Sequence, residues 1–180
     1  MQLFYDLGYF DFNLDQLYKE WKQATLVAFN QKTQYIRTAV NISSLETDNG
    51  INIVGGNNKN YDISTYSFAT ISKQFSGSHT QEVMLEFEKM FNKQGLRCSR
   101  IKYAALNSNS HIRTHVDLLY NYRYHYAVRT NEHCTMNIDN ESYVLNKPGH
   151  LYKVLANRPH SVDNKGQEMR LFLSFDVLEL

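Results

Sequence analysis

The sequence predicts a mainly β protein, an antiparallel sandwich or barrel with helices packed against its outside. After Gly95, short strand-like runs with polar breaks follow one another closely, which is typical of such sheets. Two helical patterns precede this block, so the helices are expected to flank it. The chain also holds 13 Tyr and 10 Phe but one Trp. Aromatic residues of this kind suit a half-buried pleated surface.

Length and charge limit the remaining possibilities. At 180 residues the chain is most simply one domain, with residues 1–95 as a helix-containing support region and 96–180 as the β-barrel core. The net charge of +1 provides no basic field, so we expect no nucleic-acid partner. No apolar run is long enough to span a membrane, and the start lacks signal-peptide features. With two separated cysteines, we expect a reduced, cytoplasmic protein.

The first elements are an aromatic segment and a helix. Residues 1–12 are expected to form an edge strand or an arm packed on the core. Asn13 is a good N-cap, and Gln16 stands where a capping-box partner would. The apolar stripe of the following helix consists of Leu14, Leu17, Tyr18 and Trp21.

The next region is less regular. Tyr35–Ile42 is predicted as a strand, and a short apolar segment lies at Ile51–Val54. The flanking segments Glu46–Gly50 and Gly55–Tyr61 are rich in Asn and Gly and are predicted as loops. Such loops are either plain surface turns or a lid over an active-site mouth, since binding functions concentrate on loops.

A second helix and six strands complete the pattern. Ser78 with Gln81 forms a capping box, and Gly95 suits the end of the helix. Its core-facing residues are Val83, Met84, Phe87, Met90 and Phe91. The predicted strands are Cys98–Leu106, Tyr122–Arg129, Thr135–Ile138, Ser142–Leu145, Leu151–Leu155 and Met169–Val177.

Three residues in the second half are of the types that bind a metal ion. In an extended segment, side chains at i and i+2 point to the same face, so His115 and Asp117 can reach one ion together. His160 comes much later and is expected on an opposite strand of the barrel. Two imidazoles and a carboxylate form the facial triad of non-haem Fe(II), which leaves positions open for a bidentate keto acid and for oxygen.

Arginines follow in the same region. Arg170 shares a strand face with Phe172 and Ser174, and its planar fork suits a carboxylate. Arg123 and His125 likewise share a strand face. Inward polar groups of this kind are costly without an anion to meet, which favours a bound carboxylate.

The segment from His115 to Val177 resembles the aspartyl/asparaginyl β-hydroxylase family, within the Fe(II)- and 2-oxoglutarate-dependent dioxygenases. The matching pieces are HVD at 115–117, RYHYAVRTN at 123–131, KPGHLYKV at 147–154 and NRPHSVDNKGQEMRLFLSFDV at 157–177. The resemblance implies a double-stranded β-helix, a jelly-roll or cupin-like barrel, with helices outside it. It says little about residues 1–95.

The resemblance also implies roles for individual residues. His115, Asp117 and His160 would bind Fe(II), Arg170 would hold the distal carboxylate of 2-oxoglutarate, and Arg123 with His125 would lie near its other end or the substrate. Candidates for substrate contact are Arg158 and Arg113. With O2, the enzyme would hydroxylate a C–H bond and release succinate and CO2.

The substrate stays open between a free amino acid and an Asp- or Asn-type residue of a polypeptide. Two other classes are also open. A non-catalytic sensor would bind iron and 2-oxoglutarate without producing succinate. A metal-free β-barrel binding module would show no iron-dependent stabilisation.

Overall fold

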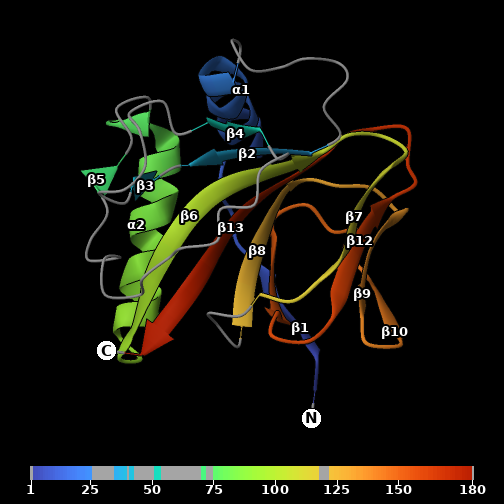
Figure 1. Cartoon of the computed structure of the whole chain (residues 1–180). Helices are drawn as coiled ribbons and strands as arrows, with labels where there is room; N and C mark the ends of the chain where they lie inside the picture. Colours follow the sequence, from blue (N-terminus) through green and yellow to red (C-terminus); the bar gives the residue numbers. More distant parts are fainter. Residues whose placement is uncertain are drawn as a thin grey trace.

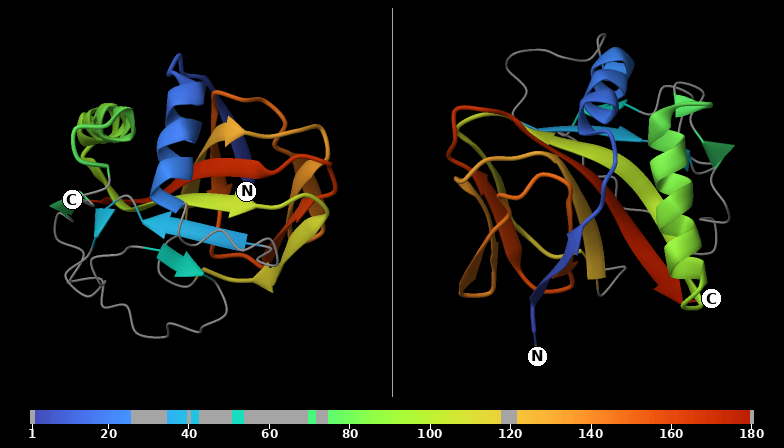
Figure 2. Two further views of the ribbon diagram at one scale, coloured as in Figure 1. Left: turned by 90° about the horizontal axis from the view of Figure 1, so that it is seen from above. Right: turned by 180° about the vertical axis from the view of Figure 1, so that it is seen from behind.

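A computed structural model describes residues 2–25, 35–39, 41–42, 51–53, 70–71, 75–117 and 122–179. The chain forms three layers, in which two helices cover one face of a seven-stranded sheet and a four-stranded sheet faces the other (Figures 1 and 2). The strands are antiparallel throughout. The predicted fold class, a mainly β jelly-roll barrel with flanking helices, is confirmed.

The larger sheet has the strand order β1-β11-β8-β13-β6-β2-β4. Its strands are β1 (Phe4–Tyr9), β11 (His150–Leu155), β8 (Tyr122–Arg129), β13 (Arg170–Glu179), β6 (Leu96–Leu106), β2 (Tyr35–Ala39) and β4 (Ile51–Ile53). The N-terminal segment is therefore an edge strand, as one of the two expectations had it. It pairs with β11 far along the chain.

The smaller sheet has the order β10-β9-β12-β7. Its strands are β10 (Glu141–Val144), β9 (Cys134–Ile138), β12 (His160–Asn164) and β7 (Ser110–His115). A further pair consists of β3 (Asn41–Ile42) and β5 (Thr70–Ile71). All six predicted strands of the second half are present, and β7 and β12 are additional to those six.

The two helices begin at their predicted caps. Helix α1 spans Leu14–Thr25, and the Asn13 side chain accepts a hydrogen bond from the backbone N–H of Gln16. Helix α2 spans His79–Asn92, and Ser78 caps it in the same way. Beyond its end, Gly95 has φ +70°, a left-handed conformation that glycine adopts without strain.

Glu20 links helix α1 to α2 by hydrogen bonds and, through Thr80, to the sheet. Its carboxylate accepts hydrogen bonds from the backbone N–H groups of His79 and Thr80 and from the Thr80 hydroxyl. Thr80 in turn bonds the buried hydroxyl of Tyr103 on β6. Burial alone would raise the pKa of Glu20, but the bonds from Thr80, Gln16 and the helix N-terminus outweigh it and lower that pKa.

Two hydrophobic clusters lie on opposite faces of the larger sheet. The first joins both helices to the sheet and includes Trp21, Phe87, Phe91, Tyr126 and Phe175. The second fills the space between the sheets and includes Leu106, Ala127, Met136, Val162 and Phe172. The space between the sheets is also where polar residues gather at one end of the barrel.

The loops predicted at Glu46–Gly50 and Gly55–Tyr61 lie outside the described residues, so neither the turn nor the lid interpretation is tested. The strand predicted at Tyr35–Ile42 is present as β2 and β3. Neither helix in the described part of the chain combines the length and apolar character needed to cross a bilayer.

Candidate metal centre

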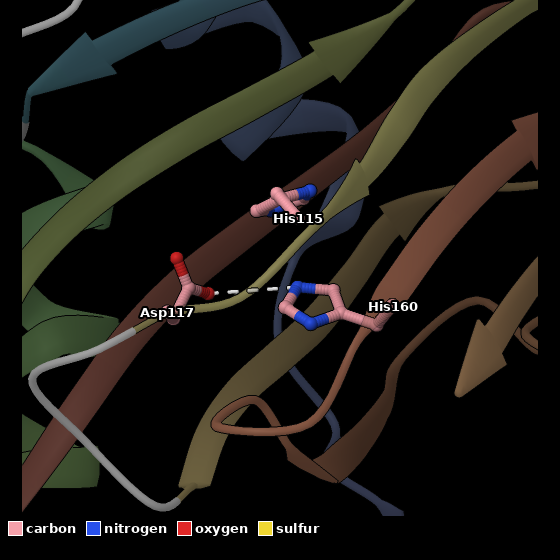
Figure 3. Close-up of side chains that lie close together, drawn as sticks. All are labelled: His115, Asp117 and His160. Carbon is pink, nitrogen blue, oxygen red and sulfur yellow. Dashed lines mark ion pairs between the residues drawn. The ribbon is translucent and has the colours of Figure 1, made fainter. Parts of the chain in front are cut away.

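Two neighbouring strands of the smaller sheet bring the predicted ligands together (Figure 3). His115 is the last residue of β7 and pairs directly with His160, the first residue of β12. Asp117 follows two residues later, where its backbone N–H donates to the carbonyl of Ala156. The expectation that His160 comes from an opposite strand is wrong. Adjacent antiparallel strands place it beside His115, because directly paired residues share a face.

The three side chains form one cluster. Potential ligand atoms of His115, Asp117 and His160 all lie within 4.8 Å of one another. The imidazole rings of the two histidines have centroids 4.2 Å apart, and His160 Nε2 lies 3.6 Å from Asp117 Oδ2. In the part of the chain that the structure describes, this is the group of His, Cys, Asp and Glu residues spaced to share an ion.

Backbone carbonyls fix the tautomers of both histidines. His115 Nδ1 lies 2.8 Å from the carbonyl oxygen of Arg113, and His160 Nδ1 lies 2.9 Å from that of Arg158. A carbonyl oxygen only accepts, so each Nδ1 carries a proton and donates it. In the neutral rings the Nε2 lone pairs are then available to a metal, and these outer hydrogen bonds are the usual means of orienting a ligand histidine.

The protonation states of Asp117 and His160 leave lone pairs that a cation between the ligand atoms can bind. Burial alone would raise the pKa of Asp117, but the positive charge of Arg123, with smaller effects of His160 and His115, outweighs it and lowers that pKa. Burial also lowers the pKa of His160 and keeps its ring neutral. An ionised carboxylate oxygen and an imidazole lone pair therefore face each other at 3.6 Å, too far apart for a hydrogen bond. Two such lone-pair donors are stabilised by an ion between them, so the residues present fit a metal.

A cavity of about 20 Å³ lies beside the cluster, between the two sheets. Its wall on the larger sheet is polar and is formed by Lys102, Ala104, Arg123, His125, Arg170 and Ser174. Its wall on the smaller sheet adds Ile112, Met136 and Val162 to the two histidines. The volume is about that of one water molecule, so a dicarboxylate enters only if long side chains of the polar wall move.

Arg170 and His125 lie on the polar wall as the strand pattern predicted. Arg170 is 2% exposed, and its guanidinium lies 4.2 Å from the centre of the Phe172 ring. His125 Nδ1 lies 2.7 Å from the hydroxyl of Ser174. Burial, followed by the charges of Arg170 and Arg123, holds the pKa of His125 well below its ordinary value, so this ring is neutral.

Arg123 lies between two carboxylates of the protein. Its Nη1 is 2.5 Å from Asp117 Oδ2, and its Nε is 2.8 Å from Asp176 Oδ1. The argument that Arg123 requires a bound anion is therefore wrong, because the protein itself supplies two. The sequence pattern did not identify Asp176, because its ion pair with Arg123 depends on the register of β13 against β8. This register places the two residues opposite each other.

The two arginines predicted to contact substrate lie away from the cavity wall. Arg158 has a side chain that is 51% exposed and binds Asp139 Oδ2 through Nε and Nη2, at 2.9 and 2.8 Å. Arg113 is exposed, and its carbonyl orients His115. Both arginines thus contact the metal ligands through their backbone carbonyls and not through their side chains.

Lys102 and Asp176 are polar residues of this site that sequence reasoning did not name, and Ser174 was named only as a residue on the same strand face as Arg170. Lys102 and Ser174 pair across β6 and β13, and Ser174 pairs with His125 on the other side. The signal that could have found them is strand alternation, because residues two apart from Ala104, Arg170 and Phe172 share their face.

Comparisons with known proteins place these observations in a family context. The family model described as aspartyl/asparaginyl beta-hydroxylase matches residues 7–179. No curated protein sequence matches the chain significantly.

Among solved structures, a 2OG-Fe(II) oxygenase family oxidoreductase from Burkholderia pseudomallei has 13% identity and TM-score 0.43, over 57% of this chain and 59% of that one. The TT1209 protein from Thermus thermophilus has 20% identity and TM-score 0.35, over 51% and 90%. Salicylate 1,2-dioxygenase from Pseudaminobacter salicylatoxidans has 13% identity and TM-score 0.36, over 55% and 33%.

Proposed function

The chain belongs to the aspartyl/asparaginyl β-hydroxylase family, and from this premise we propose that it is an Fe(II)- and 2-oxoglutarate-dependent dioxygenase that hydroxylates a C–H bond. The observation that carries the proposal is the convergence of His115, Asp117 and His160 beside a cavity with a cationic wall. The ligand set is two imidazoles and one carboxylate, which suits non-haem Fe(II) and leaves coordination positions open.

The protein's own residues prepare this site before anything binds. The carbonyls of Arg113 and Arg158 hold the two imidazoles in the tautomer that presents Nε2. Bound iron with 2-oxoglutarate would supply the activation of O2, with succinate and CO2 as co-products. The apolar residues Ile112, Met136 and Val162 limit water at the cavity, which protects a reactive centre from side reactions.

The polar wall supports a dicarboxylate as co-substrate. Lys102 and Arg170 carry positive charges on this wall of the cavity, beside Arg123, whose charge is met by Asp117 and Asp176. In the proposal, Arg170 binds the distal carboxylate through its planar fork, supported from below by the Phe172 ring. His125, neutral and hydrogen-bonded to Ser174, contributes a polar contact without adding a like charge.

For the substrate we propose an amino acid, free or as an Asp- or Asn-type residue of a polypeptide, which is the class that the family name indicates. We propose a cytoplasmic setting, consistent with Cys98 and Cys134, which are both free and buried. Membrane and nucleic-acid partners form no part of the proposal.

The experiment is anaerobic titration of the metal-free protein with Fe(II) and then 2-oxoglutarate. We expect a weak visible charge-transfer band for the wild type, which His160→Ala abolishes because one of three ligands is lost. Arg170→Ala keeps the metal but weakens 2-oxoglutarate binding by about 100-fold, as expected for loss of a buried charge-assisted pair. Arg129→Ala, at the exposed end of β8, is the matched control and behaves as wild type.

Admission of O2 with a panel of amino acids and peptides then identifies the substrate through succinate release. A folded wild-type protein without the band contradicts the proposal and favours a metal-free binding module. A band without succinate for any member of the panel favours the non-catalytic sensor.

A further inference from the structure

The guanidinium of Arg123 is shared unequally between its two carboxylates. Asp176 binds one edge of the fork, with Nε at 2.8 Å from Oδ1 and Nη2 at 3.4 Å from Oδ2. Asp117 meets Nη1 alone, at 2.5 Å from Oδ2. The side chains of Arg123 and Asp176 are 8% and 1% exposed, so these contacts are shielded from solvent. Asp176 thus occupies the Nε–Nη2 edge, one of the two edges of the guanidinium that can bind a carboxylate at two points.

The atom that Arg123 touches on Asp117 is the one that a metal needs. Oδ2 of Asp117 is also the oxygen 3.6 Å from His160 Nε2, in the centre of the triad. A guanidinium bound to this oxygen competes with a metal ion for its lone pairs. A two-point contact competes more strongly than a one-point contact, because paired parallel N–H···O bonds add both energy and geometric restraint.

We propose that Asp176 is a positioning residue for the metal centre. By binding the Nε–Nη2 edge of Arg123, it holds the guanidinium in an orientation in which Asp117 meets Nη1 alone rather than a two-point edge, and so keeps Oδ2 accessible to the ion. The inference rests on the proposed function, since it assigns a role toward the metal of the same site. Asp176 acts through Arg123 and touches neither His115 nor His160 in the contacts of the described residues.

The proposal predicts how metal affinity changes in two single variants and their combination. Asp176→Asn releases the guanidinium of Arg123 to turn a two-point edge toward Asp117, so the affinity for a divalent ion falls by about tenfold, within the range for partners that orient metal ligands. Arg123→Gln removes the competitor, so the affinity stays at or above that of wild type. In Arg123→Gln with Asp176→Asn, there is no arginine to redirect, and the affinity equals that of Arg123→Gln.

The measurement is Mn(II) binding to the metal-free protein by isothermal titration calorimetry, with thermal unfolding as the check on folding. The matched control is Asp163→Asn. This carboxylate lies on β12, the strand that carries His160, and binds Asn137 at 2.9 Å rather than Arg123. Its loss is expected to leave Mn(II) affinity unchanged. Asp176→Glu, which keeps a carboxylate for Arg123, is expected to restore most of the wild-type affinity.

The outcomes separate this inference from the proposed function. Wild-type protein that is folded but binds no Mn(II) contradicts the function itself. Wild-type binding with an unaltered Asp176→Asn variant overturns the positioning role. So does an affinity that stays equally low in the double variant, because a purely structural carboxylate is not rescued by changing Arg123.

If Asp176→Asn does not fold, Arg123→Gln and the double variant still provide the test, since the proposal requires equal affinities for these two. A difference of more than about threefold between them, beyond the usual scatter of additivity for independent sites, contradicts it.

Discussion

The two faces of the seven-stranded sheet are built from the same strands but differ completely in character. Along β8, Tyr124 and Tyr126 pack against the helices, whereas Arg123 and His125, which alternate with them, line the cavity. Along β13, Phe175 packs against the helices while Ser174 lines the cavity. The pleat therefore separates adjacent residues into two environments only a sheet's thickness apart.

The difference shows how the barrel supports a polar site. On the helix face, the stabilising contacts are non-directional and numerous, with Phe87 within 5.3–5.5 Å of four other rings. On the cavity face, polar groups depend on individual partners, as in the bonds from Arg123 to Asp176 and between His125 and Ser174. The apolar face can supply the stability that the polar face does not, because burial of aromatic rings contributes far more than a paired charge.

The largest effect on stability is expected from the helix face. Phe87→Ala on α2 removes a fully buried ring that contacts Phe10, Phe12, Tyr126 and Phe175. The expected loss is about 3–5 kcal/mol in the free energy of unfolding, measured by urea denaturation.

Mn(II) affinity of the remaining folded Phe87→Ala protein is expected to match wild type, since the change lies on the other side of the sheet. The control Leu85→Ala, half-exposed on the same helix, should cost less than about 0.5 kcal/mol. A fall in Mn(II) affinity in Phe87→Ala but not in Leu85→Ala would show that the two faces are coupled.

Local sequence patterns were enough to predict the residues of the helix face and most of the helices and strands. The caps at Asn13 and Ser78 and the alternation in β8 and β13 depend on residues close in sequence, and each is present in the structure. Apolar periodicity identified the helix stripes because burial of those residues forms the larger core.

The strands that carry the histidine ligands were not among the six strands predicted from their sequence pattern, for a physical reason. The sequences of β7 (Ser110–His115) and β12 (His160–Asn164) are largely polar, so they lack the apolar alternation of a half-buried strand. Their place in the sheet comes from pairing with each other and with β9. Asp176 was missed for a related reason, since cross-strand register is a property of the whole sheet rather than of any segment.

A pH-dependent loss of stability is expected from the cavity face. The pKa of His125 is held well below its ordinary value by burial and by Arg170 and Arg123. Between the unfolded value near 6.5 and the lowered folded value, the unfolded chain binds a proton that the folded chain does not. The free energy of unfolding of the metal-free protein therefore falls as pH decreases below about 6.5, by at most about 1.4 kcal/mol per pH unit for this one group.

Urea denaturation between pH 5 and 7.5 measures this slope. His125→Gln should reduce the slope, although His160, whose pKa is also lowered by burial, contributes in the same direction and remains. His133→Gln, an exposed histidine in the turn before β9, should leave the slope as in wild type. An identical slope in His125→Gln and wild type would assign the pH dependence to other groups.

The smallest effect is expected from Lys102, which is only partly buried on the polar wall. Its charge lowers the pKa of both Asp117 and His125, so its ammonium group acts on the metal end of the cavity. Lys102→Gln should weaken 2-oxoglutarate binding by about three- to tenfold, less than loss of Arg170, because a partly solvated charge is screened.

Salt distinguishes Lys102 from Arg170 on the polar wall. Raising the ionic strength from about 0.05 to 0.5 M should reduce the difference between wild type and Lys102→Gln, since the Debye length falls below the distances over which an exposed charge acts. The difference between wild type and Arg170→Ala should persist, because Arg170 is buried against Phe172. Lys93→Gln, just beyond the end of α2, is the control for a general effect of net charge. Equal salt sensitivity for Lys102→Gln and Arg170→Ala would mean that both residues act through the same buried contact. The charges of the polar wall would then all be shielded from solvent, as the rings of the helix face are.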